Sequence, residues 1–251
     1  IPNANINSYS SKAVSAFESV KSEKMLVDGL RVETPTLIIR FSPNGYIESL
    51  FDKEEQREVV RSLGLDRIFL NEDVPQAWDN WDVDKDLIEN LKPFAGDVKI
   101  SHQEVNKSTV TFESVMTLSE QSTLTKLTRI YSGKKQIDFE TSIDWHEKHK
   151  LLKAGFDLDI NATGLRSEIQ FGSIVRPVWK TNSFEEAKFE VSNQRWSDYS
   201  EPGYGAAILN DSKYGINALG NLVTLTLQKS GTHPDPMADE GVHSFKYSIL
   251  L

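Results

Sequence analysis

The sequence predicts an all-β protein, specifically a large antiparallel β-sandwich. Apolar and polar residues alternate with a period of two in several segments, and aromatic residues make up 10% of the chain. Strands with one buried face and one solvated face build antiparallel sheets that pack against each other. A length of 251 residues is ample for one such domain with a sizeable core.

The predicted strands follow one another from residue 30 onward. Residues 36–41 lead through the turn 42-SPNG-45 into residues 46–52, which is a hairpin pattern with Asn-Gly at its tip. Helical spacing occurs only in 52–63 and 82–92, and both segments are short. Clean alternation follows in four further segments, which are 135–145, 156–160, 223–228 and 245–249.

The first residues of the chain differ in composition from the rest. Residues 1–28 are polar and rich in Ser, Asn and Lys, which predicts a linker or the tail of a preceding domain, followed by the sandwich over residues 29–251. The first residues include neither a methionine nor a signal-peptide pattern, so we expect a piece of a longer protein. No apolar run approaches the ~20 residues that span a bilayer.

Net charge and cysteine content exclude some classes of function. A net charge of −9 without a basic stripe argues against nucleic acid as a partner, and equally against an anionic membrane surface. The chain has no cysteine, which excludes disulfides and thiolate chemistry and is compatible with a reducing compartment.

The stretch 74-VPQAWDNWDVDKD-86 holds the densest set of functional side chains. Two tryptophans and four aspartates suit a metal loop, a catalytic carboxylate pair, a sugar-stacking platform or a structural corner. As a calcium-binding EF-hand loop starting at Asp82, it would need Gly where Leu87 stands and Glu where Pro93 stands. The EF-hand template therefore fails, although an irregular calcium site stays open.

Histidines offer two further metal patterns. The segment 146-HEKH-149 lacks the His-Glu-x-x-His spacing of zinc proteases and follows a predicted strand, so we interpret it as a polar strand end. The segment 230-SGTHPDPMADEGVH-243 carries metal-compatible donors without a recognised zinc spacing. Its prolines and glycines predict a defined loop, and such loops carry binding residues on sheet proteins.

Acidic loops with tryptophans fit carbohydrate. Indole faces stack on the C–H face of a pyranose, while short carboxylates and amides take its hydroxyls. Trp78, Trp81, Trp179 and the segment 195-RWSDYSEPGYG-205 offer such groups. The alternative for any single tryptophan is a place in the core, which is where most tryptophans of a large sandwich lie.

The chain resembles the C-terminal β-domain of glycoside hydrolase family 38, the α-mannosidases, and in particular their cytosolic/vacuolar and bacterial branch. The resemblance spans most of residues 30–251. It is carried by 44-NGYIESLFDKEEQREVV-60, 78-WDNWDVD-84, 144-DWHEKHKLLKAGF-156, 168-EIQFGSIVRPVWKTNS-183, 186-EAKFEVSNQRWSDYSEPGYGAAILNDSKYG-215 and 233-HPDPMADEGVHSFKYSIL-250.

The resemblance implies a retaining, metal-dependent α-mannosidase, with zinc the expected metal and two catalytic aspartates in an N-terminal α/β domain. No metal ligand and no catalytic residue can be carried over to this chain, which is expected to be inactive alone. Its fold is implied to be a supersandwich, similar to galactose mutarotase, that packs on the catalytic domain and helps wall the cleft.

Two loops are candidates for that wall, 78–84 and 229–241. Lys229 stands where family members often have arginine, so the charge is kept but the bidentate fork is lost. The candidate substrate-binding residues are Trp78, Asp79, Trp81, Asp82, Lys229, Asp235 and Asp239.

We expect two partners, the N-terminal catalytic domain of the same polypeptide and a mannose-containing oligosaccharide, and a cytoplasmic location. Two alternatives remain. One is a free-standing carbohydrate-binding module, and the other is a structural or adhesive sandwich that binds no sugar.

Overall fold

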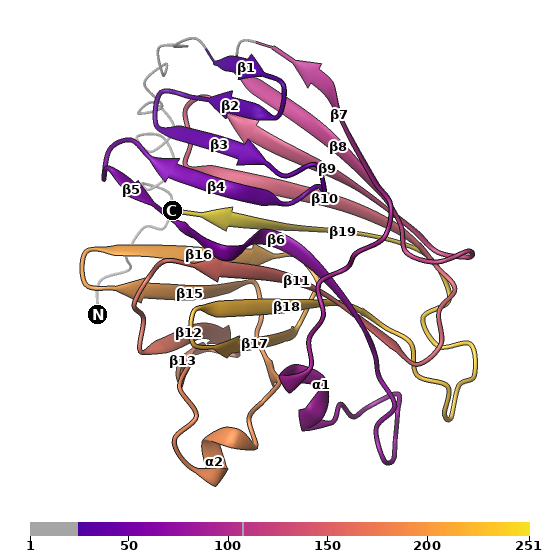
Figure 1. Cartoon of the computed structure of the whole chain (residues 1–251). Coiled ribbons are helices and arrows are strands. Elements are labelled where there is room, and N and C mark those ends of the chain that lie inside the picture. Colours follow the sequence, from indigo (N-terminus) through magenta and orange to yellow (C-terminus); the bar gives the residue numbers. More distant parts are fainter. Residues whose placement is uncertain (1–24, 107) are drawn as a thin grey trace, which may run out of the picture.

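The computed structural model describes residues 25–106 and 108–251, which form two antiparallel sheets around one apolar core (Figure 1). In this described part the first sheet has ten strands, in the spatial order β1 (Leu26–Asp28), β2 (Arg31–Glu33), β3 (Leu37–Phe41), β4 (Ile47–Asp52), β6 (Val60–Glu72), β11 (Lys150–Leu158), β18 (Leu222–Lys229), β17 (Gly215–Leu219) and β14 (Val191–Ser192), with β5 (Arg57–Glu58) paired to β4.

The second sheet has nine strands within the same described residues. Their spatial order is β13 (Gly172–Pro177), β12 (Gly164–Ile169), β15 (Trp196–Glu201), β16 (Tyr204–Asn210), β19 (Gly241–Leu250), β10 (Gln136–Trp145), β9 (Thr123–Tyr131), β8 (Thr109–Thr117) and β7 (Val98–Val105). Helices α1 (Lys85–Glu89) and α2 (Ser183–Glu186) are short and lie below the strands in Figure 1. The predicted all-β sandwich is therefore confirmed.

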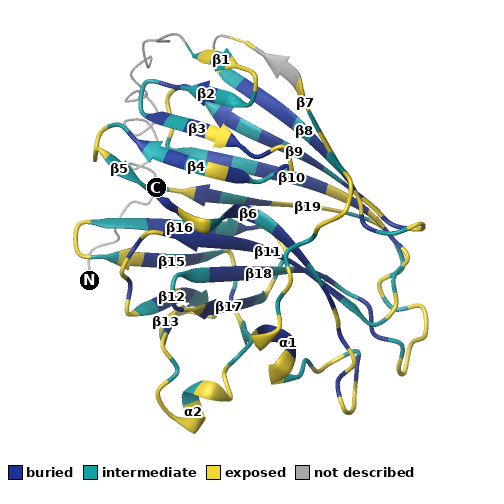
Figure 2. Ribbon diagram, viewed as in Figure 1, coloured by how far each residue is buried: buried dark blue, intermediate teal, exposed yellow. Residues whose placement is uncertain are grey.

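The period-two segments form the strands predicted for them. Residues 36–52 fold as the β3–β4 hairpin, and Gly45 at its turn has a φ of 77° that suits glycine. In β10, the side chains of Ile137, Phe139, Ile143 and Trp145 are all 0% exposed. Figure 2 shows such buried positions concentrated along the strands. Alternation therefore predicted both the strands and their core-facing sides.

The prediction of a helix from the spacing of apolar residues in 52–63 is wrong. This segment forms β5 and the start of β6, joined to β4 by a turn. Val59 and Val60 are adjacent in sequence but both buried, at 0% and 8% exposure. Val59 lies in the break between β5 and β6, where the regular alternation of a strand is interrupted. Two successive inward residues imitate a helical face. The other helical segment, 82–92, does contain a helix, the five-residue α1.

The predicted tail at residues 1–28 lies mostly outside the described residues. Its last part is described: Leu26–Asp28 form β1, and Val27 pairs with Val32 of β2. These three residues therefore belong to the edge of the first sheet.

Strands β11 and β18 are buried on both faces. Lys153 of β11 is 0% exposed, and its ammonium donates hydrogen bonds of 2.7 Å to the Glu190 carboxylate and to the Thr226 hydroxyl. Burial lowers the pKa of Lys153, and the Glu190 charge opposes that change. Ile88 of α1 packs near Leu151 on the same outer face. The expected solvated face of β11 is thus covered by connecting segments.

A second buried cation links the two sheets. The ammonium of Lys126 on β9 is paired with the carboxylate of Asp66 on β6, and the Tyr247 hydroxyl on β19 donates to the same carboxylate at 2.7 Å. Burial raises the pKa of Asp66, whereas the Lys126 charge lowers it. A buried charge that loses its partner is strongly destabilising, so this contact fixes how the sheets face each other.

Replacing Lys126 with Met tests this link. We expect Lys126→Met to lower the free energy of unfolding by about 3–5 kcal/mol, because it leaves the Asp66 carboxylate buried without a cation. Urea unfolding measures the change. Arg40→Met is the matched control: it breaks the exposed Arg40–Glu48 ion pair and should change stability by less than about 1 kcal/mol. Equal effects of the two substitutions would contradict a structural role for the buried pair.

Candidate functional site

Three neighbouring strands of the first sheet bring distant segments of the chain together. Strand β6 ends at Glu72, β11 begins at Lys150 and β18 ends at Lys229, and Lys150 pairs with Glu72 while Leu151 pairs with Lys229. The segment that follows β6 (residues 73–84) is called here the first loop, and the segment that follows β18 (residues 230–240) the second loop. Both loops lie on the right-hand side of Figure 1.

Backbone hydrogen bonds continue the strand pairing into these loops. The Asp73 N–H donates to the His149 carbonyl at 2.7 Å, and the His149 N–H donates to the Ser230 carbonyl at 2.7 Å. His149 therefore joins the beginnings of both loops, and it does so with a φ of 53°. That left-handed conformation is uncommon for a residue other than glycine and is maintained by its surroundings.

Asp79 connects the first loop to the second. Its Oδ2 accepts hydrogen bonds from the Thr232 N–H at 2.7 Å and the Thr232 hydroxyl at 3.0 Å, and its Oδ1 accepts from the His233 N–H at 2.8 Å. Its side chain also lies 3.7 Å from Nδ1 of His149. Asp79 is 8% exposed, so most of its hydrogen-bonding capacity is used inside the protein.

The two loops approach each other so closely that glycine is required at one point. A Cβ atom on Gly231 would lie 2.7 Å from the carbonyl oxygen of Asp79 and would also meet the Asn80 side chain. The Asn80 amide in turn reaches the Asp235 carbonyl at 3.5 Å. The first loop thus packs directly on the second.

Hydrogen bonding and burial shift the pKa of two carboxylates in opposite directions. The Thr232 N–H is the largest of several influences that lower the pKa of Asp79. Asp73 is 2% exposed, and burial raises its pKa even though the Lys229 ammonium is paired with it and opposes the rise. The charge of Asp79 adds to the rise at Asp73, so the two groups belong to one electrostatic network.

A cavity of about 300 Å³, lined by both polar and apolar residues, lies between the loops. Four of the predicted site residues line it although they come from distant segments: Trp81, Lys229, Asp235 and Asp239. Gly231 and Asn80 contribute to the wall, where the loops touch. The cavity combines an indole, two carboxylates and an ammonium, which is the mixture suited to a neutral polyhydroxyl ligand.

The remaining three predicted residues are placed differently. Asp79 is buried at the contact between the loops. Trp78 and Asp82 do not line the cavity; the Asp82 carboxylate accepts from the neighbouring Val83 N–H at 2.9 Å. Trp78 is 64% exposed with a φ of 58°, and its ring meets that of Trp81, 69% exposed, edge-on at 6.2 Å. Both indoles face solvent and are not core residues.

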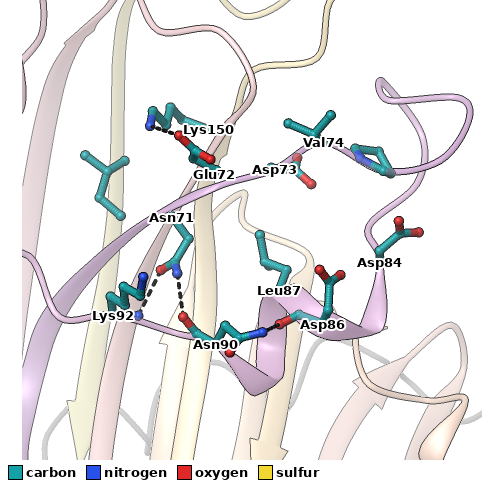
Figure 3. A pocket seen from close by; sticks show the side chains of 12 residues that line it. Asn71, Glu72, Asp73, Val74, Asp84, Asp86, Leu87, Asn90, Lys92 and Lys150 are labelled. Atoms are coloured by element: carbon teal, nitrogen blue, oxygen red, sulfur yellow. Dashed lines mark hydrogen bonds and ion pairs between the residues drawn. The ribbon is translucent and has the colours of Figure 1, made fainter.

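A larger cavity of about 520 Å³ lies on the other side of Asp73, and Figure 3 shows it. Asn71 fixes one wall, because its amide donates to the Asn90 carbonyl at 2.8 Å and accepts from the Lys92 N–H at 3.1 Å. The Lys150 ammonium lies 3.6 Å from Glu72. Asp73 lines this cavity and its ion-pair partner Lys229 lines the smaller one, so the pair connects the linings of the two cavities.

Sequence patterns gave no indication of Asp73, and they placed His149, Gly231 and Thr232 inside singled-out segments without giving any of the three a role. Each acts through a contact between segments more than 70 residues apart, such as the 83 residues that separate Thr232 from His149. The one local signal was the richness of 230–243 in residues that restrict or free the backbone.

Metal-binding groups do not gather in the described part of the chain. Within residues 25–106 and 108–251, no group of three or more His, Cys, Asp or Glu side chains could hold a metal ion. The donors His233, Asp235, Asp239 and His243 are therefore not arranged as a zinc site, and residues 82–86 are not arranged as a calcium site. In the same residues, no helix is long and apolar enough to cross a membrane.

The chain folds as an all-β sandwich with a cavity between two loops, and comparison with known proteins gives its family. The sequence model of the glycosyl hydrolases family 38 C-terminal domain matches residues 32–237. The chain therefore belongs to glycoside hydrolase family 38 and corresponds to its C-terminal domain.

Individual relatives agree with this assignment. The chain is 36% identical to alpha-mannosidase G of Dictyostelium discoideum, over 87% of its own length and 20% of that protein. It is 34% identical to human alpha-mannosidase 2C1, over 84% of its length and 21% of that protein. The chain thus spans about a fifth of the length of these relatives.

A solved structure shows the same fold. The crystal structure of an alpha-mannosidase from Enterococcus faecalis V583 superposes with a TM-score of 0.78, covering 91% of this chain and 30% of that one, at 14% identity. At this identity the likeness concerns the fold alone. The two-sheet sandwich of this chain is therefore also found in a solved structure of an alpha-mannosidase.

Substituting Gly231 tests the close contact between the loops. We expect Gly231→Ala to lower the free energy of unfolding by about 1–3 kcal/mol, because the added Cβ forces the second loop away from Asp79. Urea unfolding measures the effect. Gly172→Ala is the matched control, since a Cβ there meets nothing within 4 Å. A Gly231→Ala protein as stable as the control would contradict the observed packing.

The lowered pKa of Asp79 predicts an acid-labile contribution to stability. The pKa of Asp79 in the folded protein lies below its ordinary value of 3.8, which applies to the unfolded chain. Such a carboxyl contributes its full stabilisation to the folded state at pH values above the unfolded-state pKa. The contribution is lost as the pH falls through the folded-state pKa. The difference in unfolding free energy between wild type and Asp79→Asn should therefore be constant above about pH 5 and shrink below about pH 4. Asp82→Asn, on the exposed side of the same loop, is the control for replacing a carboxylate of this loop by an amide. An Asp79→Asn difference that grows on acidification would contradict this sign.

Proposed function

We propose that this chain is the C-terminal region of a retaining, metal-dependent α-mannosidase that acts on α-linked mannose in glycans. The observation that carries the proposal is the family match over residues 32–237, together with relatives named alpha-mannosidases of which the chain spans about a fifth. Most of such a polypeptide lies in other domains. The catalytic carboxylates and the metal then belong to an N-terminal α/β domain, which is the proposed partner of this one.

The chemistry of a retaining glycosidase explains why two carboxylates elsewhere must do the work. One forms a covalent glycosyl-enzyme, and the other serves first as acid and then as base, about 5–5.5 Å away. A metal in such an enzyme would hold sugar hydroxyls and stabilise developing charge. The described residues of this chain present no group that fits the metal. In this proposal the catalytic steps belong to the N-terminal domain, and this chain alone is expected to be inactive.

The part of this domain in the reaction would be binding. The cavity between the loops offers the indole of Trp81 for a C–H face of mannose, and it offers Lys229, Asp235 and Asp239 for hydroxyl groups. Such a wall binds ground state and transition state alike, so it affects KM more than kcat. We also propose the cytoplasm as its location, consistent with a chain without cysteine.

A second candidate function is a free-standing carbohydrate-binding module. It is favoured by the exposed indoles of Trp78 and Trp81, which stand beside a cavity formed entirely by this chain. Titration of the 251-residue chain with mannose distinguishes the two. A module binds sugar by itself, whereas a cleft wall with half its cleft elsewhere binds weakly or not at all.

Removing Trp81 from the full-length polypeptide tests the proposal. The full-length polypeptide should hydrolyse an aryl α-mannoside and should lose this activity when a chelator removes the metal. The 251-residue chain alone should show no turnover, with or without added zinc. Trp81→Ala should raise KM about three- to tenfold with kcat nearly unchanged, because one stacking contact is lost. Trp179→Ala is the control, an exposed indole that does not line this cavity. Turnover by the 251-residue chain alone would refute the proposal that catalysis belongs to the N-terminal domain.

A further inference from the structure

Two aspartates of the first loop hold the second loop at neighbouring points. Asp73 is paired with the ammonium of Lys229, where the second loop begins. Asp79 accepts hydrogen bonds from Thr232 and His233, three and four residues further along. The held residues lie on either side of Gly231 and end two residues before Asp235, so the first part of the second loop's cavity wall is anchored on the first loop.

Neither aspartate is available to a ligand in the cavity. Asp73 and Asp79 are 2% and 8% exposed, and neither lines the 300 Å³ cavity. Both oxygens of Asp79 already accept hydrogen bonds from the second loop. Asp235 and Asp239, in contrast, are exposed and line the cavity. Carboxylates that look alike in the sequence therefore occupy two distinct environments.

We propose that Asp73 and Asp79 are positioning residues, which fix the start of the second loop on the first and thereby set Lys229 and Asp235 opposite Trp81 at the spacing that a sugar requires. The inference deepens, and rests on, the proposed function of the cavity as a sugar-binding wall. Asp73 acts on Lys229 directly, and Asp79 acts on Asp235 through Thr232 and His233. Loops that are already fixed in the free protein lose less conformational entropy when a ligand binds than mobile loops would.

The surroundings of the two aspartates support this role. The Asn80–Asp235 contact and the absence of space for a Cβ on Gly231 keep the loops in one arrangement. The side chain of Lys229 is 17% exposed. Its ion pair with Asp73 restricts a flexible side chain that would otherwise adopt many rotamers. Hydrogen bonds to a charged carboxylate are among the stronger ones, which suits an anchor.

Hydrogen exchange in the 251-residue chain tests the anchor without relying on activity. Asp79→Ala should speed exchange of the Thr232 and His233 amides by about tenfold or more, because both N–H groups lose their acceptor. Asp82→Ala is the matched control and should leave both amides unchanged. Exchange at these two amides that stays as slow as in wild type would overturn the inference, whatever the catalytic activity of the polypeptide.

Kinetics of the full-length polypeptide test the positioning role. Asp79→Ala and Asp73→Asn should each raise KM for an aryl α-mannoside by about tenfold and leave kcat within about twofold, which a merely structural defect would not do selectively. Thr232→Ser, which keeps the hydroxyl and the N–H, should retain wild-type KM, whereas Thr232→Val should raise it. Faster amide exchange with an unchanged KM would overturn the positioning role.

The two tests separate the inference from the function on which it rests. If the wild-type polypeptide hydrolyses no α-mannoside, the proposed function fails, and the positioning of a sugar wall falls with it, while the exchange result still decides whether Asp79 anchors the second loop. If the wild type is active and the variants keep its KM, the proposed function stands and the positioning inference is wrong.

Discussion

The candidate site depends on one constraint, the antiparallel pairing of β6, β11 and β18 in the middle of the first sheet. Because β11 pairs with both neighbours, residues 72, 150 and 229 must lie side by side, and the loops that follow β6 and β18 leave the sheet together. The backbone bonds of His149 extend that pairing by one residue into each loop. The cavity between the loops is thus a consequence of strand order.

Charged side chains then convert this proximity into a fixed arrangement. Asp79 satisfies two backbone N–H groups and a hydroxyl of the second loop, and Asp73 is paired with Lys229. The same use of buried charge recurs in the core, where Lys126 and Asp66 join the sheets, and on the outer face, where Lys153 holds Glu190. In this domain, buried ion pairs mark contacts between segments far apart in the chain.

The sequence was a good guide to the fold wherever alternation was regular. It failed at β6, because this strand carries left-handed residues at Gly64 and Asp66 and its register with β11 shifts twice, so inward and outward positions do not alternate. Without β6, the meeting of the two loops could not be foreseen. Residue type together with the family resemblance identified Trp81, Lys229, Asp235 and Asp239 as candidates, but neither could separate them from Asp79, whose hydrogen-bond partners Thr232 and His233 lie more than 150 residues away.

The chain belongs to glycoside hydrolase family 38 and spans about a fifth of the length of the relatives that it matches. Under the proposed function, a pre-formed pair of loops is one physical means by which this domain would contribute to a cleft shared with another domain. Under the same proposal, the exposed indoles of Trp78 and Trp81 would face either sugar or the neighbouring domain.

The most direct test of this account is a double-mutant cycle between the two loops, with unfolding free energies measured for wild type, Asp79→Ala, Thr232→Val and the double variant. If Asp79 joins the loops, the two substitutions are not additive, and the coupling energy should be about 1 kcal/mol or more. Additive effects, with a coupling energy near zero, would contradict the claim that the first loop holds the second in place.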